Sequence, residues 1–222
     1  MSIRAKPASQ KRSEEKRDRI LRALETHLRE KQFEEVSIAE IATLAGVPSA
    51  TIYQRFSNRN ATVSILMELY LRRVAEWARS SEGRVDIAGA TNLYDALLLI
   101  GRSAWRQAES QGHIMRPAYL YSRLRPDLIG ETWQSLEQVA LSGFEGLLNH
   151  FQAEIRITDT AQAASTITYF FNMMLLGKLL HHEWGSWHIL QGEELFAKEL
   201  ADFAYRYLTN GESATDATER KS

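Results

Sequence analysis

The fold is decided by the stretch Val36–Phe56, which reads VSIAEIATLAGVPSATIYQRF. It opens with Ser37 and, three residues later, Glu40. This spacing is that of a capping box, in which the serine oxygen accepts a hydrogen bond from a backbone N–H and the glutamate side chain reaches back to the serine N–H. The sequence therefore predicts a short helix that ends at Ala45.

A turn and another short helix follow directly. Gly46 can adopt the left-handed backbone conformation that ends a helix. Pro48 sets a backbone angle suited to starting the next helix, which we predict over residues 49–56. Two helices joined by a short turn that contains glycine form a helix-turn-helix unit.

The second of these helices has two different sides. A rotation of 100° per residue places Ile52 and Phe56 on one side, which we expect to be buried. The other side carries Ala50, Thr51, Gln54 and Arg55. In a DNA major groove Gln54 can pair with adenine, Arg55 with guanine, and the Thr51 methyl group can meet a thymine methyl. A tight packing unit without a nucleic-acid role would explain the apolar side but not this one.

With these residues in place, the stretch resembles the TetR family of transcriptional regulators. The resemblance covers residues 13–65 and is most specific in Ala45-Gly-Val47 and in Thr51-Ile-Tyr53 followed by Phe56. It implies phosphate or backbone contacts by Ser37, Tyr53 and Arg59, and a groove lined by five further residues. The implied DNA-binding set is Ser37, Ser49, Ala50, Thr51, Tyr53, Gln54, Arg55 and Arg59. Pro48, Ala50 and Asn58-Arg-Asn60 depart from the residues that are frequent in the family.

Composition limits the class of protein. The chain has 222 residues, with 27 Lys and Arg against 28 Asp and Glu, and no cysteine. The lack of cysteine excludes a disulfide framework, a Cys-containing zinc site and a thiol nucleophile. We find neither a signal peptide nor an apolar run that could cross a membrane, so we expect a cytoplasmic protein with no membrane partner. Only four prolines and 12 glycines interrupt the helical periodicity, which predicts an all-α fold.

Four segments are expected: a flexible basic arm over 1–12, a helix-turn-helix DNA-binding domain over 13–60, a helical effector-binding and dimerisation domain over 61–208, and a disordered tail over 209–222. Ser13 is expected to cap the first helix, and Asn58 a long fourth helix that ends near Ser80. Further helices are predicted at about 91–111, 114–123, 127–154, 159–182 and 192–208. Pro117 and Pro126 are expected to interrupt the middle section.

Charge is distributed unevenly along the chain. Residues 1–60 hold 12 basic and 8 acidic side chains, whereas residues 61–222 hold 15 and 20. A basic front indicates a contact with a polyanion at that end. The cations near the start of the first helix are Lys11, Arg12, Lys16, Arg17 and Arg19. They fit either an arm that binds DNA or a solvated helix face.

The rest of the chain carries no catalytic motif, such as a nucleophile elbow or a phosphate-binding glycine loop, so we do not expect an enzyme. We also predict no cofactor and no metal site. His181-His182-Glu183 with His188 does not suit a metal, because adjacent histidines point 100° apart on a helix. Aromatic and methionine residues predict a pocket for an effector, although each of them also fits an ordinary core. The pocket candidates are Trp105, Tyr119, Trp133, Phe144, Phe170, Met173 and Met174.

The last two helices are apolar on more than one face, which predicts that a second subunit covers one of these faces. In the TetR family this region forms a four-helix dimer bundle. The expected interface residues are Ile167, Phe171, Leu175, Leu179, Leu200 and Phe203.

Together these features predict a homodimeric regulator that binds a palindromic double-stranded DNA operator. We expect a repressor that an apolar or aromatic small molecule releases from the operator. Two alternatives stay open: a helical carrier or enzyme in which the helix-turn-helix is incidental, and a DNA-binding activator without an effector. The sequence does not identify the operator, the effector or the regulated genes.

Overall fold

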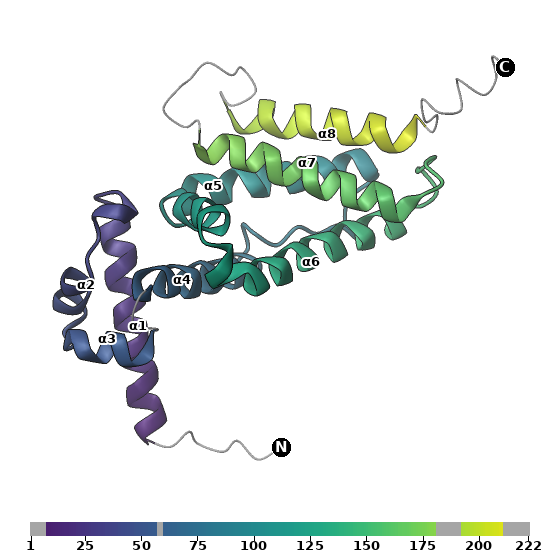
Figure 1. Cartoon of the computed structure of the whole chain (residues 1–222). Coiled ribbons are helices and arrows are strands. Elements are labelled where there is room, and N and C mark those ends of the chain that lie inside the picture. Colours follow the sequence, from purple (N-terminus) through teal and green to yellow (C-terminus); the bar gives the residue numbers. More distant parts are fainter. Residues whose placement is uncertain (1–7, 57–59, 181–191, 211–222) are drawn as a thin grey trace. The chain divides into compact units, whose positions relative to one another are not determined.

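The computed structural model describes residues 8–56, 60–180 and 192–210 (Figure 1). Within these ranges the chain forms helices and no strands, which confirms the predicted all-α class. The elements are α1 (Ala8–Leu28), a 3₁₀ turn η1 (Phe33–Glu35), α2 (Ile38–Ala45), α3 (Ser49–Arg55), α4 (Ala61–Trp77), α5 (Leu93–Leu124), α6 (Pro126–His150), α7 (Thr160–Leu180) and α8 (Glu193–Thr209). None of the described helices is both long enough and apolar enough to cross a membrane.

The chain divides into two compact units. The first unit is Met1–Glu76 together with His113–Ile129, and the second is Trp77–Gly112 together with Gly130–Ser222. This division differs from the boundary predicted after residue 60. The difference arises because most of α4, and the later part of α5, pack with the first three helices.

The first unit is held together by fully buried aliphatic side chains from four helices. Its central residues are Ile20 and Leu24 of α1, Ile41 of α2, Ile52 of α3, and Ile65, Leu66 and Leu69 of α4. Helix α1 begins at Ala8, five residues before the predicted cap Ser13, so residues 8–12 of the predicted arm are helical. The early turns of α1 are anchored to other helices, since Arg17 pairs with Glu68 of α4. The predicted cap Asn58 lies outside the described residues.

Helix α5 corrects a second expectation. The stretches 91–111 and 114–123 form one helix, and Pro117 lies inside it. Proline in a helix removes one backbone hydrogen bond and crowds the preceding turn. Here the neighbouring side chains Ile114, Met115 and Ala118 are almost completely buried in the first unit, and this packing offsets the cost.

A buried carboxylate, Glu25 of α1, connects three helices of the first unit. It forms an ion pair with Arg73 of α4, and its Oε1 lies 3.2 Å from Nη2 of Arg29 and 3.7 Å from Nε2 of His113 on α5. Burial acts to raise the pKa of Glu25, but His113 and the two arginines outweigh it and lower this pKa to about 2. The carboxylate therefore stays charged in the folded protein well below neutral pH.

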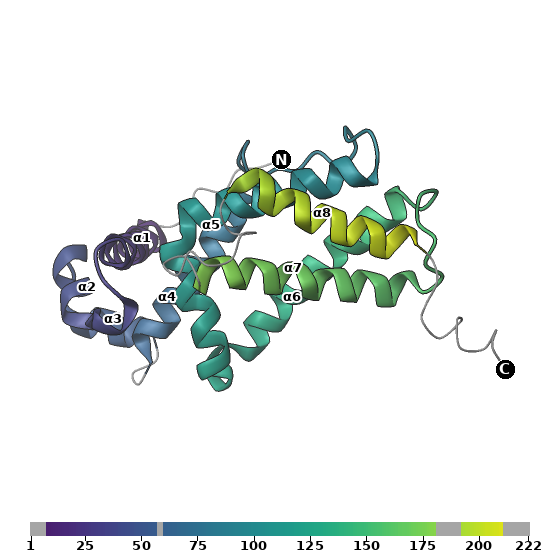
Figure 2. The same ribbon diagram turned by 90° about the horizontal axis from the view of Figure 1, so that it is seen from above.

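The second unit has its own core, built from α5, α6, α7 and α8. Figure 2 shows α7 and α8 side by side. Its largest fully buried side chain is Phe196 of α8, which packs among Leu97, Leu147 and Ile167. Helices α5 and α8 come unusually close at Gly101, where an added Cβ would lie 2.8 Å from the Cα atom of Ala197. A glycine is required at this crossing because any side chain would push the helices apart.

We predict that Glu25→Gln lowers the free energy of unfolding by about 1–3 kcal/mol at pH 7, since Arg73 loses its buried anionic partner. The pKa of Glu25 is lower in the folded protein than its ordinary value of 4.5. Its stabilising contribution is therefore complete above that value and is lost as the pH falls towards 2. Urea unfolding at a series of pH values should show the difference between wild type and variant shrinking over this interval. Glu30→Gln, at an exposed position of the same segment, is the control, and equal stability of the two variants at pH 7 would contradict the prediction.

Candidate nucleic-acid interface

The turn between α2 and α3 has the geometry that the sequence predicts. Ser37 is the N-cap of α2, and both hydrogen bonds of the capping box with Glu40 are present. Gly46 ends the helix in the left-handed conformation, with φ 62° and ψ 43°. Helix α3 then begins at Ser49, directly after Pro48. The register of α3 is therefore set by local contacts on both sides of the turn.

The capping box also occupies the hydroxyl group of Ser37, for which the sequence predicts a phosphate contact. Ser37 Oγ donates to Glu40 Oε2 at 2.8 Å, and Lys31 Nζ donates to Glu40 Oε1 at 2.6 Å. Lys31, the backbone N–H of Ser37 and its hydroxyl group lower the pKa of Glu40 to about 2. Glu40 thus stays charged well below neutral pH. The Ser37 hydroxyl would have to leave this box before it could donate to DNA.

The two sides of α3 are divided as predicted. Ile52 is fully buried and Phe56, which follows the last turn, is 5 % exposed. On the opposite side, Ala50, Tyr53, Gln54 and Arg55 are exposed, while Ser49 and Thr51 are half-buried. Buried apolar residues thus hold α3 on the core, and its polar face is exposed. A short helix held in this way can enter a DNA major groove.

The sequence predicts that the Arg55 side chain pairs with guanine, but in the structure this side chain is hydrogen-bonded within the protein. Its Nη1 donates to the backbone carbonyl of Ser13 at 2.8 Å, and its Nη2 donates to the Ser13 hydroxyl group. The side chain therefore connects the end of α3 to the first half of α1. No local pattern in the sequence indicates this contact, because the two residues are 42 positions apart. Gln54 consequently becomes the stronger candidate for reading a base.

The start of α4 is fastened to the beginning of α6. The side-chain oxygen of Asn60 accepts a hydrogen bond from Arg125 Nη1 at 2.8 Å, and Arg125 also forms an ion pair with Asp127. Arg59, the remaining predicted phosphate contact, lies outside the described residues. This contact ties the residue before α4 to the junction of α5 and α6 within the first unit.

The predicted pocket residues are divided between the two compact units. Tyr119 belongs to the first unit, where its ring meets that of Tyr70 at 6.3 Å between centroids. Trp133, which is buried, donates its Nε1 hydrogen to Glu137 at 3.0 Å. The other candidates belong to the second unit, as does Trp133. Tyr119 is thus the one predicted pocket residue that belongs to the first unit.

Within the second unit, the other predicted pocket aromatics pack against core or surface rings. Trp105 meets Phe196, with 5.4 Å between ring centroids, and the buried Lys178 places its Nζ 3.5 Å from the Trp105 ring centroid. Phe144 meets Phe171 at 4.8 Å. The predicted pocket residues Phe170, Met173 and Met174 are half-buried on α7. Lys178, which also pairs with Glu109, is a buried cation for which the sequence carries no local signal.

Most of the residues predicted for a subunit interface lie instead inside a single chain. The buried ones are Ile167, Phe171, Leu179 and Leu200. Leu175 is half-buried, and only Phe203 is exposed, at 45 %. On both helices, the side that carries these buried residues faces the core of the second unit. Apolar periodicity predicted that a second subunit covers this side, whereas the same chain covers it. The exposed aromatic side chains of α7 and α8 are Tyr169 and Phe203, and the ring of Phe170 stacks on Phe203 at 3.8 Å between centroids.

Among the described residues, no three histidine, aspartate or glutamate side chains come together as ligands for a metal ion. The histidines at 181, 182 and 188, considered above as ligands, lie outside the described residues.

Comparison with known proteins agrees with this geometry. Residues 20–62 match the family model of bacterial regulatory proteins of the TetR family. The chain is 24 % identical over 164 residues to YvdT of Bacillus subtilis (strain 168), an uncharacterized HTH-type transcriptional regulator, covering 74 % of this chain and 81 % of the relative.

Solved structures share the fold over most of the chain. The fatty acid degradation regulator FadR from Bacillus halodurans superposes with a TM-score of 0.59 at 17 % identity, over 91 % of this chain and 97 % of FadR. NalD, the secondary repressor of the MexAB-OprM multidrug efflux pump in Pseudomonas aeruginosa, superposes with a TM-score of 0.57 at 19 % identity, over 90 % and 100 % of the two chains. Residues 20–62 thus form the helix-turn-helix domain of the TetR family of bacterial regulatory proteins, and the comparisons support a TetR-family transcriptional regulator.

Proposed function

We propose that this regulator is a homodimeric repressor that binds a palindromic DNA operator through α3 and leaves it when a small molecule binds to the second unit. The observation that carries the proposal is the division of α3 into a buried anchor, Ile52 with Phe56, and an exposed polar face that includes Tyr53 and Gln54. A helix presented in this way can enter a major groove without disturbing the core beneath it.

Within this face the side chains have separate tasks. Gln54 offers an amide that pairs in a bidentate manner with adenine, and Ala50 is small enough for the helix to approach the bases. Tyr53 is exposed on the flank and can donate its hydroxyl hydrogen to a phosphate, a contact that positions the protein without reading sequence. Arg55 contributes by holding α3 on α1 through Ser13.

We predict that Gln54→Ala weakens binding to the operator by about 1–3 kcal/mol and relaxes the preference at one base-pair position in each half-site. Tyr53→Phe should weaken binding to all sequences to a similar extent, since it removes a phosphate donor. Mobility-shift titrations on the operator and on singly substituted operators would measure both effects. Unchanged affinity and an unchanged pattern of preference in Gln54→Ala would show that another residue reads the bases.

The dimer is proposed to form through the exposed aromatic surface of α7 and α8. Tyr169 is 66 % exposed and Phe203 45 %, and the ring of Phe170 stacks on Phe203. An aromatic surface of this kind gains free energy when a second copy of the chain covers it. Two copies related by a twofold axis would also match the symmetry of a palindromic operator.

We expect Phe203→Glu to yield monomers that bind the operator weakly, because each half-site then has to bind separately. Sedimentation velocity reports the oligomeric state, and a mobility-shift titration reports the affinity. Val139→Glu introduces the same charge at an exposed apolar residue of α6 and should leave the dimer intact. A wild-type protein that sediments as a monomer at micromolar concentration would exclude this interface.

The effector is proposed to be a largely apolar or aromatic molecule that binds among the aromatic residues of the second unit. Half-buried Trp105, Met173 and Met174 lie in this unit, and methionine side chains adapt to ligands of different shapes. NalD, which shares the fold, is a repressor of a multidrug efflux pump.

A compound of this class that raises the melting temperature should lower operator affinity, by about 5- to 150-fold for a typical allosteric coupling. Because coupling is reciprocal, operator DNA should weaken binding of the compound by the same factor. Thermal-shift screening of apolar aromatic compounds, followed by titration into the protein–operator complex, makes both measurements. Compounds that bind the second unit and leave operator affinity unchanged would favour regulation without an effector.

A further inference from the structure

The cations in the first half of α1 differ in whether they have partners. Arg17 forms an ion pair with Glu68 of α4, so its charge already has a partner within the protein. Arg12, Lys16 and Arg19 are exposed, and among the described residues none of the three has a carboxylate within ion-pair distance or makes a side-chain hydrogen bond. Their spacing of four and three residues places them in one stripe along the helix. We call these three residues the α1 stripe.

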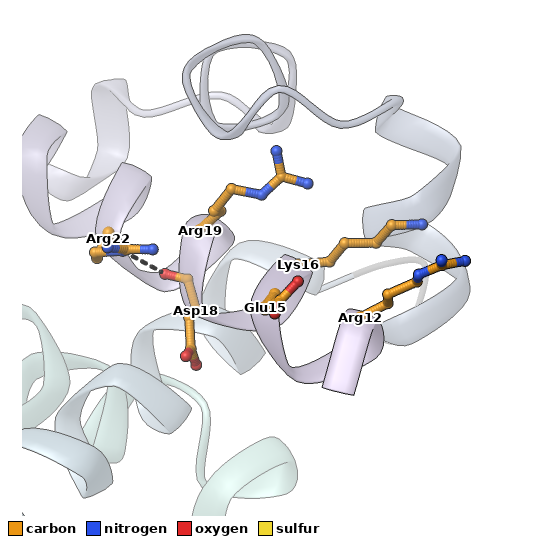
Figure 3. Close-up of a pocket in the computed structure, with 6 residues that line it drawn as sticks. All are labelled: Arg12, Glu15, Lys16, Asp18, Arg19 and Arg22. Carbon is orange, nitrogen blue, oxygen red and sulfur yellow. Dashed lines mark hydrogen bonds between the residues drawn. The ribbon is translucent and has the colours of Figure 1, made fainter. Parts of the chain in front are cut away.

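The α1 stripe lines a shallow hollow of about 560 Å³, shown in Figure 3, together with Glu15, Asp18 and Arg22. Figure 3 shows the three stripe side chains extending on one side of α1, whereas Asp18 points away from them. Asp18 Oδ1 lies 2.7 Å from Nη1 of Arg72, so its charge is already balanced. The hollow thus holds four cations and one carboxylate without an ion-pair partner in the described part of the chain, that of Glu15. The hollow is therefore positively charged.

Two contacts place the stripe beside the reading helix. At one end of α3, Arg55 is hydrogen-bonded to Ser13. In the turn that precedes α3, Nη1 of Arg19 lies 3.5 Å from the position that a Cβ on Gly46 would occupy. The stretch of α1 between these contacts carries Lys16, and Arg12 lies next to Ser13. The stripe therefore extends along the flank of α3 within the same compact unit.

We infer that the α1 stripe is a second DNA contact, which binds phosphates of the strand next to the groove that α3 reads. The inference rests on the proposed function and adds to it a surface that reads no base. At a rise of 1.5 Å per residue the three cations span about 10 Å, a length over which one DNA strand presents about three phosphates. The stripe sets affinity and its salt dependence, while Gln54 sets sequence preference.

The test compares the triple variant Arg12→Ala, Lys16→Ala, Arg19→Ala with wild type by fluorescence anisotropy. The probes are the duplex that the wild type selects from a random pool, and an unrelated duplex of the same length. For every phosphate that the variant no longer neutralises, the slope of log affinity against log salt should fall by about 0.9. We expect the triple variant to lose affinity for both duplexes by the same factor, and to select the same consensus as the wild type.

Arg17→Ala is the control, because it removes one positive charge from a neighbouring position of α1 that is already paired with Glu68. Its salt slope should stay close to that of the wild type. Far-ultraviolet circular dichroism and thermal unfolding check that the variants fold, as expected for exposed residues.

The possible outcomes separate the two proposals. A triple variant whose salt slope equals that of Arg17→Ala would show that the stripe is only a solvated helix face, and would overturn the inference while leaving operator binding intact. A change in consensus would also overturn it, since the stripe would then read bases. A wild type that selects no duplex contradicts the proposed function, and the unrelated duplex still reports whether the stripe binds phosphate.

Discussion

The interface depends on one backbone constraint, the left-handed conformation of Gly46. This turn lets α3 start immediately after α2 and brings Ile52 and Phe56 down onto the core of the first unit. A side chain at this φ angle would be strained, and a change in the turn would rotate α3. Ala50, Tyr53 and Gln54 would then leave the exposed face together. The whole reading face therefore depends on the geometry of a single glycine.

The second feature that holds the first unit is a set of polar contacts between helices. Glu25 joins α1 to α4 through Arg73 and to α5 through His113, Arg55 joins α3 to α1, and Arg125 joins the start of α6 to Asn60. Glu25 is buried, and a buried charge is costly when its partner is removed, so this group favours a single arrangement of α1, α4 and α5. Part of α5 thereby belongs to the unit that carries α3.

Local signals in the sequence were sufficient for the helix-turn-helix. Ser37, Glu40, Gly46 and Ile52 act within a few residues of their own positions, and the structure confirms what their spacing predicts. Contacts between distant residues were not predictable in this way. The engagement of Arg55, the continuous helix through Pro117, and the burial of Ile167 and Leu200 inside one chain all depend on which helices meet. Apolar periodicity shows that a face is covered, but not whether the same chain or a second copy covers it.

The measurement that tests the central claim most directly is selection of duplexes from a random pool by the full-length wild-type protein. If α3 reads the major groove in a symmetric dimer, the selected pool contains a palindrome whose half-sites are about 34–36 Å apart, or a multiple of that distance. A pool that stays random after repeated selection, with binding that depends on salt alone, would contradict sequence-specific recognition by α3.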